Sequence, residues 1–107
     1  MHVHVADVMR DYIVSLVRAT RTRSEFVLGA SPRATLALFR GVRALACLRG
    51  RSFVRPDDVK EIAPAILEHR VILSTEARLR AQDAAGVIAQ IVSSVPVPVE
   101  ADLNEPA

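Results

Sequence analysis

The sequence has no tryptophan, one cysteine and one lysine, and only four of its 107 residues are aromatic. Long β-branched runs are also scarce, so a core must be built mainly from leucine, valine, isoleucine and alanine. This composition suits packed helices better than a sheet, and a chain of this length has room for one core. We therefore expect an all-α fold, a small bundle of four to five helices with at most a very short two-stranded pairing.

These absences also exclude several classes of function. No apolar stretch approaches the roughly 20 residues of a membrane helix, and the start of the sequence lacks the pattern of a signal peptide, so we expect a soluble, cytoplasmic domain. Cys47 has no second cysteine for a disulfide, and with three scattered histidines it forms no zinc-type cluster. Lys60 lies in no glycine-rich loop, so a complete phosphate-binding loop is missing. Any nucleotide chemistry would need residues from outside this chain.

The net charge of +2 hides an asymmetry between the two halves of the sequence. Residues 1–55 hold ten arginines and three carboxylates, a balance of +7, whereas residues 56–107 have a balance of −5. A basic half could bind nucleic acid or phosphate. Alternatively, the two oppositely charged halves could attract each other within one fold.

Four segments show the spacing of apolar residues at three and four that is typical of amphipathic helices. They are 5–20, 31–50, one that begins at Pro56 and one that ends near Ser94. Pro64 lies inside the third segment and predicts a kink or an early break there.

The second segment has an unusually wide apolar face. Its apolar positions are Leu38, Phe39, Val42, Leu45, Ala46 and Leu48. They cover more than half of the helix circumference and leave a narrow arginine stripe, so we expect this helix to lie centrally with only that stripe exposed.

The connecting segments carry weaker signals. Residues 21–30 lose the helical period, and we expect Phe26 and Leu28 to tuck inward from this connector. The apolar run 71–73 could pair briefly with the extended residues 53–54.

The most informative motif is Gly29-Ala30-Ser31-Pro32-Arg33. Gly29 permits a turn, Ser31 is a good N-cap and Pro32 suits the first helical position, so Arg33 is fixed in the first helical turn. The helix dipole disfavours a cation there by about 0.3–1 kcal/mol. An outside anion would pair with this arginine, because helix N-termini attract phosphates and arginine adds a fork of donors. From the residues alone, Arg33 is either such a phosphate contact or an ordinary solvated arginine.

A longer string around this motif carries a resemblance to a known family. The string GASPRATLALFRGVRALACLRGRSFVRPDDV, with VADVMRDYIVSLVRATR before it and APAILEHRVILS after it, resembles the C-terminal lid domain of the MoxR family of AAA+ ATPases. The likeness covers about residues 3–98. We therefore expect a lid domain over residues 1–98, followed by a loose acidic tail over residues 99–107.

The resemblance implies a role for the motif. The arginine of GASPR is the sensor-2 residue of the family and reaches the γ-phosphate of ATP, which maps this role onto Arg33, with Ser31 and Pro32 beside the nucleotide. The resemblance further implies Mg²⁺ held by an absent large domain, a hexameric ring and chaperone-like work on other proteins. It also implies partners with von Willebrand factor A domains.

Two departures from the family pattern limit what is carried over. Arg55 stands where family members often have a serine or threonine N-cap, so the start of the third helix is less clearly signalled. The phosphate-binding loop and the other catalytic motifs of the large domain are absent from the sequence. The chain resembles part of an ATPase, and we expect no ATP hydrolysis from it alone.

The remaining candidates offer weaker chemistry. His2 and His4 alternate as strand ligands would, but lack further ligands and fit a solvated terminus. His69 is most simply a cation at a helix end and Cys47 a small core residue. Four other basic residues could contact nucleic acid, namely Arg40, Arg43, Arg49 and Arg51. Without interleaved aromatics or a helix-turn-helix signature we interpret them as contacts to the large domain or to an adjacent subunit, and keep a basic nucleic-acid-binding module as the alternative function.

Overall fold

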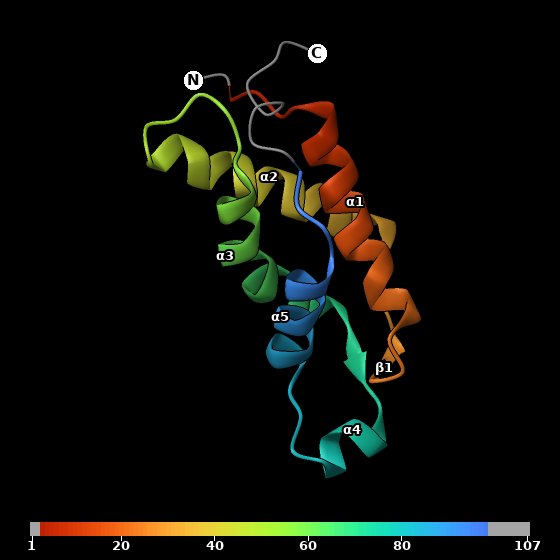
Figure 1. Cartoon of the computed structure of the whole chain (residues 1–107). Coiled ribbons are helices and arrows are strands. Elements are labelled where there is room, and N and C mark those ends of the chain that lie inside the picture. Colours follow the sequence, from red (N-terminus) through yellow and green to blue (C-terminus); the bar gives the residue numbers. More distant parts are fainter. Residues whose placement is uncertain (1–2, 99–107) are drawn as a thin grey trace.

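The computed structural model describes residues 3–98, and Figure 1 shows their arrangement. The described elements, in chain order, are α1 (Asp7–Thr22), β1 (Phe26–Leu28), α2 (Pro32–Leu48), α3 (Pro56–Leu67), the 3₁₀ helix η1 (Glu68–Arg70), β2 (Ile72–Leu73), α4 (Thr75–Leu79) and α5 (Ala84–Ser94). The predicted helical bundle with a very short two-stranded pairing is confirmed. The predicted tail, residues 99–107, lies outside the described residues.

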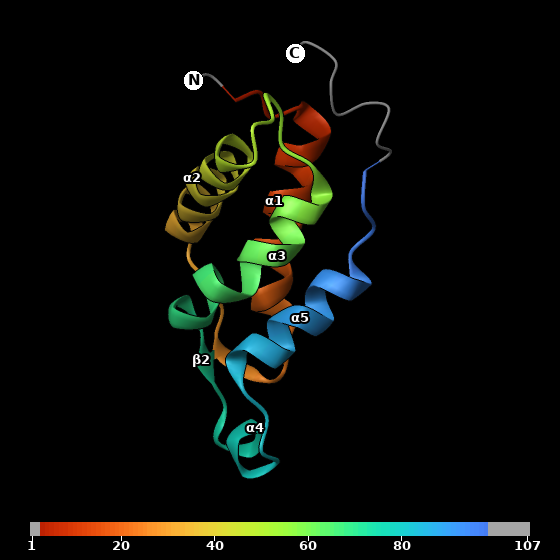
Figure 2. The ribbon, with the colours of Figure 1, turned by 90° about the vertical axis from the view of Figure 1, so that its left-hand side faces the viewer.

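Four helices enclose the hydrophobic core. Helix α3 packs against both α2 and α5, and α1 closes the bundle by contacting α2 and α5 (Figure 2). The largest fully buried side chains include Met9, Ile13, Leu16, Leu38, Leu67, Ile88 and Ile91. They come from all four helices, so each helix stabilises the fold through its apolar face.

The helix boundaries follow the local signals in the sequence. Helix α2 begins at Pro32 with Ser31 in the N-cap position, and α5 ends at Ser94, as predicted. Helix α3 begins at Pro56. It continues past Pro64 to Leu67, so the predicted early break is wrong. Burial of Ala63 and Leu67 outweighs the one backbone hydrogen bond that proline cannot donate.

Two leucines predicted to point inward are exposed. Phe26 is buried as expected, but Leu28 is not, because the register of β1 is irregular between these two residues. The irregularity turns Leu28 away from the face that Phe26 occupies. Leu48 is exposed because it is the last residue of α2, where the helix end projects beyond α3 (Figure 1).

The short strands pair differently from the prediction. β2 pairs antiparallel with β1, so that Phe26 lies opposite Leu73, and the predicted pairing of 71–73 with 53–54 is wrong. Phe53 instead forms an isolated parallel bridge with His4, in which the Val54 N–H donates to the His4 carbonyl at 3.0 Å. The cause is topological, because β1 follows α1 and β2 follows α3 and η1, and these two segments lie side by side, whereas residues 53–54 lie beside His4, just before α1 (Figure 1).

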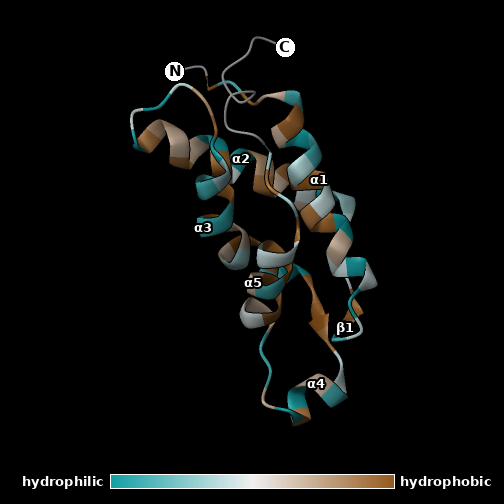
Figure 3. Cartoon of the chain, viewed as in Figure 1, coloured by the Kyte–Doolittle hydropathy of each residue, from teal (hydrophilic) through white to brown (hydrophobic). Residues whose placement is uncertain are grey.

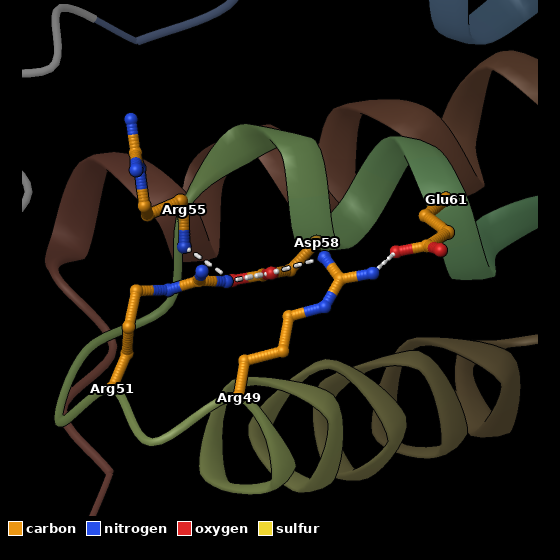
Figure 4. A network of polar contacts seen from close by, with 5 residues as sticks. All are labelled: Arg49, Arg51, Arg55, Asp58 and Glu61. Atoms are coloured by element: carbon orange, nitrogen blue, oxygen red, sulfur yellow. Dashed lines mark hydrogen bonds and ion pairs between the residues drawn. The ribbon is translucent and has the colours of Figure 1, made fainter.

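A fully buried carboxylate connects the α2–α3 loop to the start of α3 (Figure 4). Asp58, the third residue of α3, accepts hydrogen bonds from the Arg55 backbone N–H at 2.9 Å and from Arg49 Nη1 at 3.3 Å, and also pairs with Arg51. Glu61 binds Arg49 from the next turn of α3. Asp58 therefore forms one half of a capping box, because its carboxylate accepts from the backbone N–H of the N-cap residue Arg55.

The same contacts correct the interpretation of two arginines. Arg49 and Arg51 were expected to contact another domain, but both guanidinium groups bind Asp58 inside this one. They belong to the basic half of the sequence and Asp58 belongs to the acidic half. Attraction between the two halves within one fold thus accounts for part of the charge asymmetry.

We predict that Asp58→Ala lowers the free energy of unfolding by about 3 kcal/mol, because it leaves two guanidinium groups without their buried carboxylate and a backbone N–H without its acceptor. Glu61→Ala removes only an exposed pair and should cost less than about 1 kcal/mol. Urea denaturation of both variants measures the difference. Equal losses would contradict a central role for Asp58.

A second ion pair closes the turn between α1 and β1. Arg23 Nη2 lies 2.6 Å from Glu25 Oε2 and 2.7 Å from Gln90 Oε1 of α5. Hydrogen bonding from the Arg23 guanidinium lowers the pKa of Glu25 from its ordinary value of 4.5 to about 2. The ionised carboxylate is therefore favoured in the folded state.

This pair predicts a specific pH dependence. The folded-state pKa of Glu25 lies below its unfolded-state value, so the pair stabilises the fold fully above pH 4.5, and this contribution is lost as the pH falls towards about 2. The difference in melting temperature between the wild type and Glu25→Gln should be constant above pH 4.5 and shrink below it. Thermal unfolding followed by circular dichroism across this range measures it, and a difference that does not vary with pH would contradict the pairing.

Candidate functional site

The connection between α1 and α2 is anchored through the backbone of Ala30, which is fully buried. The Ala30 N–H donates to Thr20 Oγ1 at 2.9 Å, and the Ala30 carbonyl accepts from Arg21 Nε at 2.9 Å. The Thr20 hydroxyl in turn donates to the Val17 carbonyl at 2.6 Å. We call these contacts the Ala30 anchor. It fixes the residue that precedes the start of α2 on the last turns of α1.

Gly29 allows the chain to approach α1 closely. A Cβ atom on Gly29 would lie 2.7 Å from the Cα and 2.8 Å from the backbone N of Arg21. Backbone atoms cannot move aside as the end of a flexible side chain can, so any larger residue would push the connection off α1. The sequence predicted a glycine that permits a turn, and the structure shows that this close contact requires it.

The predicted site residues follow the Ala30 anchor directly. Ser31, Pro32 and Arg33 are exposed, and the Ala34 N–H donates to the Ser31 carbonyl at 2.9 Å. The Ser31 side chain makes no capping hydrogen bond within the described part of the chain. Among residues 3–98, no carboxylate pairs with Arg33. The start of α2 thus presents a hydroxyl and a guanidinium to the outside from a rigid position.

A groove of about 650 Å³ runs beside this helix start. Its lining residues are Arg21, Phe26, Val27, Leu28, Gly29, Ala30, Ser31, His69 and Arg70. The groove therefore combines apolar side chains from β1 with cationic or titratable side chains from α1 and η1. A group that carries both apolar and negatively charged surface would complement it.

The other candidates have structural roles or no assigned chemistry. Cys47 is half-buried against the core, as expected of a small core residue, and His69 lies exposed on η1, directly after α3, with its Nε2 3.2 Å from Glu68 Oε1. Within residues 3–98 no cluster of three potential metal ligands occurs. His2 lies outside the described residues. In the same range, no helix is both long and apolar enough to cross a membrane.

Thr20 and Arg21 are parts of the site that the sequence does not predict. Both residues hold the start of α2 in place, and no sequence motif indicates this role. One signal was available, because Thr20 falls on the apolar face of α1, at helical spacing from Ile13 and Val17. A threonine on a buried face needs a partner for its hydroxyl, and the Ala30 anchor supplies it.

The fold and this helix start agree with comparisons to known proteins. The profile of the AAA lid domain family matches residues 18–91. The uncharacterized protein YeaC of Bacillus subtilis is 38% identical over 99 residues, which cover 92% of this chain and 31% of that protein. Chaperone MoxR1 of Mycobacterium tuberculosis is 37% identical over 97 residues, which cover 82% of this chain and 26% of that protein.

A solved structure supports the same relationship. The crystal structure of a "putative ATPase" from Cytophaga hutchinsonii superimposes with a TM-score of 0.84 and 34% sequence identity, over 91% of this chain and 32% of that one. The chain thus spans about a quarter to a third of the length of these relatives.

The fold and these matches together define the class of protein. The chain belongs to the AAA lid domain family, the small helical domains of AAA+ ATPases. Its named relatives place it among the lid domains of MoxR-like ATPases.

The Ala30 anchor leads to a prediction about stability. Thr20→Val keeps the shape of the side chain but leaves the buried Ala30 N–H without an acceptor, so the free energy of unfolding should fall by about 1–3 kcal/mol. Thr20→Ser keeps the hydroxyl and should cost less than the valine variant. Chemical denaturation measures both, and a valine variant as stable as the serine variant would show that the anchor does not depend on this bond.

Proposed function

We propose that Arg33 is the sensor-2 arginine of a MoxR-like AAA+ ATPase and contacts the γ-phosphate of ATP bound by the large domain. The observation that carries the proposal is the placement of an exposed arginine in the first turn of α2, with no carboxylate partner among residues 3–98. A cation at this end of a helix opposes the helix dipole. A phosphate at the same end would turn an unfavourable position into a favourable one.

The residues of this chain fit one part of a nucleotide site. Arg33 offers a fork of donors, and Ser31 and Pro32 place it at a rigid helix start beside the groove. The sequence holds no phosphate-binding loop, so the large domain would have to bind ATP and Mg²⁺. The chain alone would then bind nucleotide weakly and hydrolyse none.

In the proposed mechanism, ATP hydrolysis changes the orientation of the lid relative to the large domain. The Arg33 guanidinium donates charge-assisted hydrogen bonds to a γ-phosphate oxygen and loses that acceptor after hydrolysis. Because α2 is fixed to α1 by the Ala30 anchor, the whole domain follows the movement of this arginine. The bond therefore favours one orientation of the lid relative to the large domain over another.

Wider features of the family extend the proposal. A hexameric ring, chaperone-like work on other proteins and partners with von Willebrand factor A domains are all expected from the resemblance, and a cytoplasmic location belongs to the same proposal. The name of the Mycobacterium tuberculosis relative, chaperone MoxR1, supports the chaperone part. Residues 1–98 would form the lid domain of such a protein.

A nucleic-acid-binding function gains no support from the structure. Arg49 and Arg51, two of the basic residues that suggested it, bind Asp58 within the domain. Their charge is partly neutralised there, which weakens the basic surface that such binding needs.

The test is ATP turnover by the complete protein. Arg33→Ala should reduce turnover by about 10- to 100-fold, because it removes a donor aimed at charge on the transferred phosphate. Arg33→Lys keeps the charge but loses the fork of donors, so its turnover should lie between that of the wild type and that of Arg33→Ala. Nucleotide binding should be affected less, since the large domain holds most of the phosphate contacts.

Arg78→Ala provides the matched control. Arg78 is an exposed arginine on α4, outside the α1–α2 connection, and its loss should leave turnover unchanged. If Arg33→Ala retains the fold and the turnover of the wild type, the sensor role is wrong.

A further inference from the structure

The β1–β2 pair exposes three apolar side chains on adjacent strands. Val27 is 71% exposed, Leu28 57% and Ile72 49%, and Leu28 lies directly opposite Ile72 in the strand pairing. Figure 3 shows both strands in the hydrophobic colour at one end of the bundle. We call these three residues the β1–β2 patch.

The patch differs from the other exposed apolar residues. Leu48 and Leu79 are more exposed, at 84% and 82%, but each lies alone at the end of a different helix. Single exposed apolar residues are normal on a protein surface. Three exposed apolar residues on two paired strands are instead concentrated in one place, and such a concentration is typical of interaction surfaces.

The patch and the proposed phosphate contact belong to one rigid unit. β1 ends at Leu28 and α2 begins at Pro32, so only three residues separate them: Gly29, packed on the backbone of Arg21, the anchored Ala30, and Ser31. The groove of about 650 Å³ joins the two, because Val27 and Leu28 line it together with Ser31. Any body that approaches the start of α2 along this groove therefore meets the patch.

Charge surrounds the patch on the groove side. Arg21 and Arg70 are exposed there, and His69 lies beside them. The two carboxylates nearest in sequence are already paired, Glu25 with Arg23 and Glu68 with His69. A complementary partner surface would be apolar at its centre and carry carboxylates at its edge.

We propose that the β1–β2 patch is the surface on which this lid docks against the large ATPase domain. The choice of this occupant rests on the proposed function of Arg33, because a phosphate within reach of the guanidinium brings the domain that holds it next to the patch. The relatives are about three times as long as this chain, which gives room for that domain. Docking there would remove Val27, Leu28 and Ile72 from water and hold Arg33 at a fixed distance from the nucleotide.

Photochemical crosslinking of the complete protein tests the docking. The photoreactive amino acid p-benzoylphenylalanine would replace Leu28 in one sample and Leu79, the matched exposed leucine on α4, in another. After irradiation with ATP bound, mass spectrometry identifies the crosslinked peptides. We expect crosslinks from position 28 to the large domain, in yields at least about fivefold above those from position 79.

The outcomes separate this proposal from the proposed function. Crosslinks from position 28 to another lid domain, or yields no higher than from position 79, would overturn the docking. The same experiment in an Arg33→Ala background should retain the crosslinks, because the patch does not need the guanidinium. Retained crosslinks together with unchanged ATP turnover in Arg33→Ala would refute the sensor role and leave the docking surface intact.

Discussion

The backbone of one buried alanine determines how the functional end of this domain is arranged. Ala30 is held by the Thr20 hydroxyl on its N–H side and by the Arg21 guanidinium on its carbonyl side, while Gly29 packs against the backbone of α1. These contacts set where β1 ends and where α2 begins. The exposed arginine and the apolar strands thus share one support, and neither can shift without the other.

The arrangement of charge separates structural arginines from those open to a partner. Asp58 engages Arg49 and Arg51 and forms one half of the capping box of α3, so part of the basic half of the sequence is neutralised inside the fold (Figure 4). Among residues 3–98, Arg33 pairs with no carboxylate. A sequence balance of +7 over residues 1–55 therefore overstates the charge that this domain offers to other molecules.

The sequence predicted the features that depend on neighbouring residues, such as the start of a helix. Ser31 and Pro32 define the start of α2 because an N-cap position and a fixed φ are local constraints. Partner choice between strands was wrong, because it depends on which helix ends meet in the bundle. Leu28 was misplaced by an irregular register that no residue pattern reveals. The role of Asp58 was missed because its arginine partners come from a connection whose path the sequence does not specify.

The length of α2 determines how far its end moves when the domain rotates about the anchored start of the helix. Seventeen residues at a rise of about 1.5 Å form a rod of about 25 Å. If the domain rotates by about 10° with the Arg33 end as its pivot, the Leu48 end sweeps through about 4 Å, which is the scale of a hinge movement between domains. α2 would then act as a lever arm that turns a small rotation about its anchored start into a displacement of about 4 Å at its far end.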